Sequence, residues 1–313
     1  MMKLKQLKWP WWFKKAPWFA IVILGLFLFS AVFTDIITSY SPTAINLTNR
    51  LLPPGTEGHF LGTDTLGRDL FTRLMYGGRV SLLVSVLVLL VAGGIGLTVG
   101  IIAGYFGGTA DSILMRVVDI FLSFPPILLA IVFAVAMGPG VRTIIIAISA
   151  VYWARFSRII RAEVLQIKEQ EFVALAKVAG CSHIYIMIKH ILPNVFDTFM
   201  VVMSLQIGMV IRLESTLSFL GAGISPPTPS WGQMVGAGRN YINTAWWLSI
   251  IPGAALAAVI HSFNMFGDWV RDMMDPQLSA IMAGGDDRDG RGWLAGLSRL
   301  WGKIATISKN RRV

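Results

Sequence analysis

Six long apolar runs, separated by polar stretches, dominate the pattern of this chain. They cover about Trp18–Thr34, Val80–Tyr105, Leu114–Met137, Thr143–Phe156, Val195–Leu217 and Trp246–Val270. A helix needs roughly 20 apolar residues to cross the hydrocarbon core of a bilayer. The apolar residues are continuous rather than alternating, and only helices and closed barrels satisfy their backbone in lipid, so the pattern predicts helices. We therefore expect an all-α polytopic membrane protein with six transmembrane helices.

The first and fourth runs need separate interpretation. The first follows a basic, aromatic segment, as in a signal peptide, but it is long for the apolar region of such a peptide and lacks a clean small-x-small cleavage site. Further spans follow it, so we interpret it as an uncleaved first helix. The fourth run is short and ends in the sequence YWARF, whose aromatic residues are typical of a membrane interface.

Composition and charge support this assignment. Of the 313 residues, 55% are hydrophobic and 14% are charged, and the mean hydropathy is +0.65; soluble domains carry about a quarter charged residues. The formal net charge of +10 comes from basic residues that flank apolar runs, which favours a role in topology over nucleic-acid binding. With the N-terminus inside, most of these residues fall on the cytosolic side, so both termini are expected there. The single cysteine, Cys181, excludes an intrachain disulfide framework.

The polar stretches divide the chain into three parts. Residues 1–16 form a basic cytosolic segment, residues 17–276 the transmembrane domain, and residues 277–313 a cytosolic tail. Within the domain, loops 35–79 and 221–245 are expected outside the membrane, as a docking face, a lid over a pore or ordinary ordered loops, and loop 157–194 in the cytosol. In the tail, apolar positions at three- and four-residue steps among basic residues predict an amphipathic helix on the inner leaflet, or packed on a partner subunit. These positions are Trp293, Leu294, Leu297, Leu300, Trp301, Ile304 and Ile307.

Residues 171–194, here called the coupling segment, are polar and helix-prone although they lie between two apolar runs. Residues 171–179 are rich in helix formers, and Gly180 interrupts them. Ser182 is suited to cap a second short helix that continues to about His190, and Pro193 is expected to end it. A rigid helix–glycine–helix knob joined to two transmembrane helices converts the movement of a bound cytosolic partner into helix tilt. The sequence has no Gly-x-x-x-x-Gly-Lys-Ser/Thr phosphate loop, so we expect no enzyme and a power stroke supplied by a partner.

The coupling segment resembles the EAA loop of ABC importer permeases, in which EAA is followed by three residues, Gly, nine residues and I-x-L-P. Gly180 and the Leu-Pro pair at 192–193 match at the right spacing. The triplet falls on residues 174–176, where only the last alanine is kept, and His190 stands at the isoleucine position. The peptide/nickel permeases depart in the same way. Their E-(Y/F)-V and R/K-H-I-L-P-N patterns match residues 171–173 and 189–194.

Four other blocks resemble the C-type subunit of the same peptide/nickel subgroup, in the right order. They are LGTDTLGRDLFTRLMYGGRVSL (61–82), MRVVDIFLSFPPILLAI (115–131), ESTLSFLGAGISPPTPSWG (214–232) and FGDWVRDMMDP (266–276). The resemblance covers about residues 17–276 and does not extend to the tail.

The resemblance implies a permease subunit of an ATP-driven, binding-protein-dependent importer in the bacterial cytoplasmic membrane. A heterodimer with a second homologous permease would form the pathway, two cytosolic ATPases would use ATP and Mg²⁺, and an extracytoplasmic protein would deliver the solute. No cofactor, metal or nucleic acid is expected on this chain, and membrane lipid surrounds it. Di- or oligopeptides are the expected substrates, with nickel, a metallophore or another small solute as the alternative.

Two other classes of protein remain open. A self-contained secondary transporter usually shows inverted repeats and charged residues at the midplane. The predicted arrangement of six spans with one cytosolic knob fits that pattern poorly. A membrane scaffold or receptor would use the knob as an adaptor site.

The candidate site residues form two groups. The ATPase-coupling candidates are Glu171, Phe172, Ala174, Ala176, Gly180, Cys181, Ser182, His183, Ile184, Lys189, His190 and Pro193. The pathway or gate candidates are polar or ionisable residues of the last two spans, because such groups at membrane depth usually face protein or water. They are Arg212, Glu214, Ser218, Asn264 and Asp268. The first two are two positions apart and are not expected to face each other; Glu214 also fits a place near the outer interface.

Four further features have ordinary structural interpretations. Arg116 and Asp119 are three residues apart and are expected to pair on one helix face, with a transport role as the alternative. Pro125-Pro126 is expected to kink the third span, as a hinge or a static bend. His261 lacks partners at ligand spacing and is interpreted as a hydrogen-bonded helix residue rather than a nickel ligand. Cys181 is interpreted as a small residue beside the glycine turn.

Overall fold

The computed structural model describes residues 16–274 of the chain. The predicted basic N-terminal segment, except Ala16, and the predicted amphipathic tail helix lie outside these residues. Residues 17–270 form one compact unit. Between residues 16 and 274 the secondary structure is helical, apart from two isolated β-bridges, Thr56 to His59 and Thr63 to Asp69. The all-α prediction is therefore confirmed for the described part of the chain.

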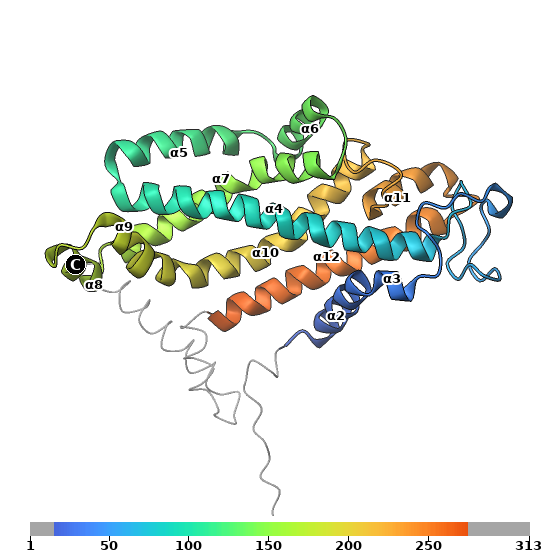
Figure 1. Cartoon of the computed structure of the whole chain (residues 1–313), viewed down its shortest axis with the longest axis horizontal. Helices are drawn as coiled ribbons and strands as arrows, with labels where there is room; N and C mark the ends of the chain where they lie inside the picture. Colours follow the sequence, from blue (N-terminus) through green and yellow to red (C-terminus); the bar gives the residue numbers. More distant parts are fainter. Residues whose placement is uncertain (1–15, 275–313) are drawn as a thin grey trace, which may run out of the picture. The chain divides into compact units, whose positions relative to one another are not determined.

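The helices follow one another along the chain with short connections, except before α4 and α11 (Figure 1). They are α2 (Trp18–Val32), α3 (Thr34–Ile37), η1 (Leu47–Asn49), α4 (Leu70–Phe106), α5 (Gly108–Ser123), α6 (Pro126–Met137), α7 (Val141–Ile167), α8 (Glu171–Val178), α9 (His183–Ile186), the π-helical η2 (Met187–Ile191), α10 (Leu192–Phe219), α11 (Trp231–Gly238), η3 (Arg239–Tyr241) and α12 (Trp247–Met274).

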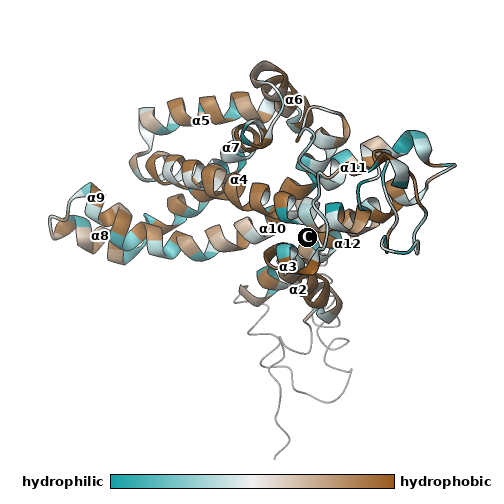
Figure 2. Ribbon diagram, turned by 45° about the vertical axis from the view of Figure 1, so that its right-hand side comes forward, coloured by the Kyte–Doolittle hydropathy of each residue, from teal (hydrophilic) through white to brown (hydrophobic). Residues whose placement is uncertain are grey.

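Four of the described helices are long and apolar enough to cross a membrane. They are α4, α7, the continuous helix from His183 to Phe219, and α12. The bent pair α5–α6 makes a fifth candidate if it crosses as one span, and α2 is a shorter apolar helix of 15 residues. Figure 2 shows hydrophobic residues predominating along α2, α4 and α6. The structure thus supports several spans of the predicted kind, four or five of them by length and composition.

The third predicted span is two helices rather than one kinked helix. α5 and α6 meet at an angle of 91°, with the break at Phe124 and Pro125. Phe124 precedes a proline and is extended (φ −85°, ψ 140°), as the proline ring requires. Pro126 then occupies the first turn of α6, where its missing N–H costs nothing. The two prolines therefore end one helix and begin the next.

Two helices extend beyond the apolar runs that predicted them, into the predicted loops 157–194 and 35–79. α7 continues to Ile167, well past the predicted end at Phe156. The guanidinium groups of Arg158 and Arg161 pair with Asp119 and Asp111 of α5, so polar residues continue the helix after the apolar run ends. α4 likewise begins at Leu70, inside the predicted loop 35–79.

The α4–α7 pair forms the centre of the bundle (Figure 1). Gly96, Gly100 and Gly104, spaced by four residues, form the α4 side of the contact. A Cβ atom at Gly100 would lie 2.7 Å from Cβ of Ile160, and one at Gly104 would lie 2.7 Å from Cβ of Val164. Small residues at this spacing let two membrane helices approach closely, which is where van der Waals packing stabilises helix pairs in lipid.

The two ends of the bundle carry different structures (Figures 1 and 2). α8 and α9 lie at one end, and the loop before α4 lies at the other, close to α11. Hydrophilic residues gather at both ends in Figure 2. The long helices α4, α7, α10 and α12 run between these ends and join the coupling segment to the opposite end of the bundle.

Candidate functional site

The coupling segment folds as the predicted helix–glycine–helix unit over its first half. α8 spans Glu171–Val178, and Gly180 follows with φ +78°, a left-handed conformation that glycine adopts without strain. The hydroxyl of Ser182 then accepts a hydrogen bond from the backbone N–H of Tyr185 at 3.3 Å, as the N-cap of α9. The predicted break and the predicted cap are both confirmed.

The predicted end of the second helix at Pro193 is wrong. α9 continues through the π-helical η2 into α10, so that residues 183–219 form one helix. The N–H of Leu192 bonds to the carbonyl of Met187, five residues earlier. In an α-helix the ring of Pro193 would clash with the carbonyl four residues earlier; π turns are wider and occur as local insertions within α-helices. The wide turn therefore admits the proline, and the knob is joined directly to α10.

The exposed face of the coupling segment is apolar. Leu175 is 68% exposed, Val178 87% and Ile184 66%, and Phe172, Tyr185 and Ile188 are exposed as well. The opposite side, with Val173, Ala176 and Ile186, is buried in the main hydrophobic core. Large exposed apolar patches are rare on monomers and occur where a protein or a membrane is contacted.

The coupling segment is anchored to the end of α4. The hydroxyl of Tyr105 lies 2.8 Å from Nδ1 of His183, and the ring of Phe106 packs beside the same imidazole at 5.8 Å between centroids. Nζ of Lys177 lies 5.8 Å above the ring of Tyr105, within reach of a cation–π interaction. Nζ of Lys168, after α7, donates to the carbonyl of Gly104 at 3.0 Å. These contacts attach the coupling segment and the end of α7 to the end of α4.

The predicted coupling residues lie together at this end, with different exposure. Nine of the twelve candidates are exposed, Ala176 is buried, and Cys181 and His190 are half-buried. The exposed ones are Glu171, Phe172, Ala174, Gly180, Ser182, His183, Ile184, Lys189 and Pro193. The ring of His190 packs between Phe172 and Tyr185, at 6.1 and 5.8 Å between centroids. His190 therefore supports the apolar face from behind.

The predicted pathway residues are not brought together into one site. Arg212 is exposed and lines a cavity of about 400 Å³ between α7, α10 and the start of α6. Arg155 of α7 lines the same cavity. Arg155 lies at the end of the fourth predicted apolar run and near the middle of the 27-residue helix α7.

Glu214 lies on another face of α10, inside the bundle. Its side chain is completely buried, and its carboxylate accepts hydrogen bonds from Ser81 of α4 (3.0 Å), Ser215 (3.2 Å) and Ser218 (2.8 Å). The hydroxyl of Ser218 in turn accepts from the N–H of Ile224, after α10. Buried carboxylates are stabilised by such hydrogen bonds. Arg212 and Glu214 therefore do not face each other, as predicted.

The remaining pathway candidates lie on α12. Asn264 and Asp268 are both exposed. A Cβ atom at Gly208 of α10 would lie 2.7 Å from Oδ1 of Asn264, so this side chain covers a glycine on the neighbouring helix. His261 is also exposed. Among residues 16–274, no group of three or more His, Cys, Asp or Glu side chains is placed to hold a metal ion.

One predicted ion pair is wrong. Asp119 pairs with Arg158 of α7 instead of with Arg116 of its own helix. An interhelical partner of this kind holds α5 against α7, whereas a pair along one helix would have stabilised only α5. Arg161 and Asp111 make a second α5–α7 contact, with two hydrogen bonds of 2.5 Å.

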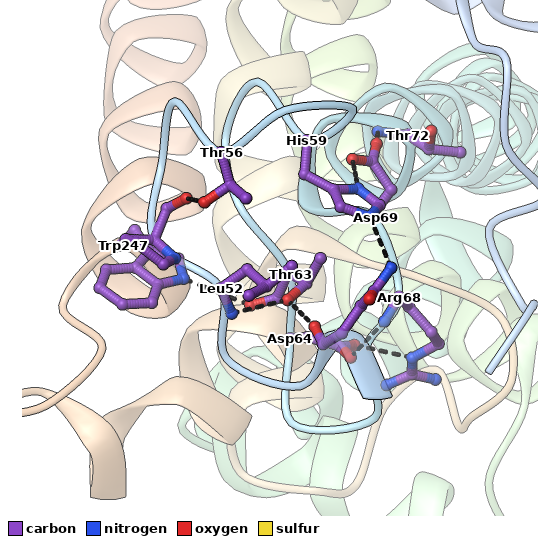
Figure 3. A network of polar contacts seen from close by, with 11 residues as sticks. Leu52, Thr56, His59, Thr63, Asp64, Arg68, Asp69, Thr72 and Trp247 are labelled. Atoms are coloured by element: carbon purple, nitrogen blue, oxygen red, sulfur yellow. Dashed lines mark hydrogen bonds and ion pairs between the residues drawn. The ribbon is translucent and has the colours of Figure 1, made fainter. Parts of the chain in front are cut away.

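The loop before α4 is rigidified by buried polar side chains (Figure 3). Asp69 caps α4 by accepting from the N–H of Thr72 at 2.8 Å, and it also accepts from Nδ1 of His59 at 2.9 Å. Asp64 accepts from Nε of Arg68 at 2.7 Å and from the N–H of the same residue at 3.0 Å. The block LGTDTLGRD, noted above as a family resemblance, therefore folds the loop back on itself and starts the helix.

Two tryptophans join this loop and α11 to the bundle. Nε1 of Trp247, at the start of α12, donates to the carbonyl of Thr63 at 3.3 Å (Figure 3). Nε1 of Trp231 in α11 donates to the carbonyl of Leu74 in α4 at 2.8 Å, and its ring covers Gly77 and Gly78. These contacts make the end of the bundle opposite the coupling segment a single rigid surface.

An ion pair at the same end joins α3 to α4. Asp35 accepts from the hydroxyl of Tyr76 at 2.7 Å and from Nη1 of Arg79 at 2.9 Å. These two donors, the hydroxyl first, hold the pKa of the Asp35 carboxyl below its usual value. The contribution of this contact to stability is therefore present at neutral pH and is lost as the pH falls through the lowered pKa.

Comparison with known proteins defines the class. Residues 96–280 match the family described as binding-protein-dependent transport system inner membrane component. The chain is 40% identical over 256 residues, 82% of its length, to the probable D,D-dipeptide transport system permease protein of Escherichia coli K12, of which the match covers 86%. It is 41% identical over 255 residues to the dipeptide transport system permease protein of Bacillus subtilis 168, covering 81% and 79% of the two chains. It is 38% identical over 259 residues to the nickel transport system permease protein of E. coli K12, covering 83% and 93%.

The chain therefore belongs to the inner membrane components of binding-protein-dependent transport systems, and within them it is similar to the ABC permeases of the peptide and nickel systems. It is a multi-pass protein of the cytoplasmic membrane and a transport subunit. The family predicted from the coupling segment and the four sequence blocks is confirmed.

Proposed function

We propose that this chain is one permease subunit of an ATP-driven importer of di- or oligopeptides, and that the coupling segment receives force from a cytosolic ATPase. The observation that carries this proposal is the exposed apolar face of α8 and α9, on a knob continuous with α10. Such a face needs a protein partner to cover it. Membership in a binding-protein-dependent family supports the identity of that partner as an ATPase.

The proposed topology has six crossings. α2 is the first crossing, and the bent pair α5–α6 is the third. Both termini and the coupling segment then lie in the cytosol, and the loop before α4 lies outside with α11. The distribution of Lys and Arg supports this orientation. The bend between α5 and α6 supports a crossing that is broken where it lines the cavity with Arg155 and Arg212, because irregular backbone in a membrane is tolerated beside a cavity.

The proposed mechanism uses the coupling segment as a lever. Closure of the ATPases on ATP displaces α8 and α9. The continuous helix from His183 to Phe219 extends about 55 Å at 1.5 Å per residue, and it carries Arg212 in its distal third. A small tilt at the coupling segment therefore moves the wall of the cavity, while the bond between Tyr105 and His183 takes α4 along.

The partners follow from the same proposal. A second homologous permease completes the pathway as a heterodimer, two ATPases bind ATP and Mg²⁺, and an extracytoplasmic protein docks on the rigid surface built from the loop before α4 and α11. This chain itself binds no cofactor. Support for peptides as the substrate comes from the names of the D,D-dipeptide and dipeptide relatives; the nickel relative supports nickel or another small solute as the second candidate.

Reconstitution in proteoliposomes tests the proposal. The chain is co-purified with the second permease and the ATPases, and the uptake of a labelled dipeptide and of Ni²⁺ is followed with and without ATP and the binding protein. We expect dipeptide uptake that requires both. Nickel uptake under the same conditions would favour the second candidate. Ion-driven uptake by this chain alone, without the ATPases, would contradict the proposal and favour a secondary transporter.

A further inference from the structure

Two arginines from different helices line one cavity in the membrane-spanning part of the bundle. The cavity has a volume of about 400 Å³, and Arg155 of α7 and Arg212 of α10 are its charged wall residues. Its other walls are largely apolar, from residues such as Leu122, Ile127 and Leu213. Sites for small molecules have this character, with volumes of about 300–1,000 Å³ and a few polar groups on apolar walls.

Among residues 16–274, neither Arg155 nor Arg212 has an acidic partner, unlike the two arginines that follow on α7. Arg158 and Arg161, one and two turns further along α7, pair with Asp119 and Asp111. Arg155 and Arg212 form no ion pair with any residue from Ala16 to Met274. The guanidinium of Arg212 instead contacts the sulfur of Met209 at 3.8 Å. Glu214, close in sequence, is already bound to three serines inside the bundle.

The lack of an acidic partner within the described residues matters because both arginines line a cavity between long apolar helices. Arg155 and Arg212 belong to two helices that are long and apolar enough to cross a membrane, and charged side chains of such helices usually face water or pair with an opposite charge. Two like charges facing one cavity with low-dielectric walls produce a strong local positive potential, which concentrates anions. A guanidinium binds a carboxylate through two parallel hydrogen bonds, so the ligand group that fits best is a carboxylate.

We propose that Arg155 and Arg212 form a binding station for the carboxylate of the transported solute, and that this station makes the permease itself selective for carboxylate-bearing substrates. The inference rests on the proposed function, which it deepens by naming the chemical class that the pathway recognises. A peptide with a free C-terminal carboxylate meets this requirement. The exposed side chain of Arg212 and its position on α10 also place the station on the helix that the coupling segment moves.

The experiment uses the complete transporter with its binding protein in proteoliposomes. Uptake of one dipeptide with a free C-terminal carboxylate is compared with uptake of the same peptide amidated at its C-terminus. The ratio of the two rates is measured for the wild type, Arg155→Gln, Arg212→Gln and the matching Lys variants. Arg142→Gln is the control, because Arg142 is an exposed residue of the same α7 helix that does not line the cavity. The binding protein is the same in every assay, so a change in the ratio belongs to the permease.

We expect each Gln variant to lower the preference for the carboxylate peptide about tenfold, because the loss of one hydrogen-bonding contact to a charged group weakens binding by about that factor. The Lys variants should retain part of it, since they keep the charge and lose the bidentate geometry. Arg142→Gln should match the wild type, and stimulation of ATP hydrolysis by the binding protein should persist in all variants.

Three results would overturn the inference. Unchanged preference in both Gln variants, or equal uptake of the two peptides by the wild type, would show that the permease does not read the carboxylate, while ATP-driven uptake would leave the proposed function intact. If the second permease is lost from purified Gln variants but not from Lys variants, the arginines form ion pairs with an acidic side chain of that subunit and do not bind the solute. Absence of ATP-driven uptake in the wild type would overturn the proposed function and the inference with it.

Discussion

The hydroxyl of Tyr105, at the end of α4, lies 2.8 Å from Nδ1 of His183 in α9. Together with the packing of Phe106 against His183 and the approach of Lys177 to the Tyr105 ring, this bond joins the coupling segment to a helix from a distant part of the sequence. We therefore expect α4 and α10 to respond together to a displacement of the knob.

Replacement of Tyr105 by Phe tests this connection. The variant removes one hydrogen bond and keeps the ring that packs against Phe106 and His183. A hydrogen bond contributes about 0.5–1.5 kcal/mol, so we expect about two- to tenfold less solute transported per ATP hydrolysed in proteoliposomes. Tyr185→Phe is the matched control, since Tyr185 is an exposed residue of the same segment. Equal coupling in the two variants would count against the role of this bond.

The conformation of Gly180 provides a second prediction. Its φ of +78° is accessible to Gly and tolerated by Asn, but strained in a β-branched residue. No atom lies within 4 Å of a Cβ placed there, so conformation rather than crowding decides the outcome. We expect Gly180→Val to reduce uptake while membrane insertion is normal, and Gly180→Asn to behave nearly as the wild type. Normal uptake per ATP in Gly180→Val would show that the turn is not needed for coupling.

From the close contact between α4 and α7 we predict that a larger residue at Gly100 lowers the stability of the protein. Gly100→Val would place Cβ 2.7 Å from Cβ of Ile160, and overpacking of this kind costs about 1–3 kcal/mol. Gly94 lies on the same helix with no atom within 4 Å of its Cβ position, so Gly94→Val is the control for the change in helix propensity. Thermal unfolding in detergent should show a lower midpoint for Gly100→Val only. Similar midpoints for the two variants would mean that α4 and α7 are not so closely packed.

Two substitutions of Glu214 distinguish a structural role of this residue from a role in transport. Glu214→Gln keeps an oxygen acceptor for the serine hydroxyls, whereas Glu214→Leu leaves Ser81, Ser215 and Ser218 without their partner. Each buried unsatisfied group costs about 1–3 kcal/mol. We expect Glu214→Leu to accumulate poorly in the membrane and Glu214→Gln to fold and transport. A folded Glu214→Gln protein that fails to transport would instead support the predicted place of Glu214 in the pathway.

The sequence was sufficient for the features that depend on local chemistry. Apolar runs predicted the long helices, Gly180 and Ser182 predicted the turn and the cap, and the family was identified from short blocks. The errors arose where tertiary contacts decide. Pairing of Arg158 and Arg161 with α5 extends α7 beyond its apolar run, and a π turn carries the helix through Pro193.

The same limit applied to the candidate sites. Arg155 was not a candidate in the sequence, because which helices enclose the cavity that it lines depends on their packing. Arg212 and Glu214 looked equivalent in the sequence, yet one faces a cavity and the other lies within the bundle. Which face of a membrane helix meets lipid, protein or a cavity is set by packing with the other helices.

Site-specific photo-cross-linking tests the central claim most directly. A photo-reactive amino acid is placed at Val178 or Ile184, the exposed apolar positions of the coupling segment, and at Phe60, which is 76% exposed in the loop at the opposite end of the bundle. After irradiation of the assembled transporter, we predict that Val178 and Ile184 cross-link to an ATPase subunit and that Phe60 does not. Cross-linking of the ATPase to Phe60, or of the binding protein to Val178, would contradict both the docking role of the coupling segment and the proposed orientation.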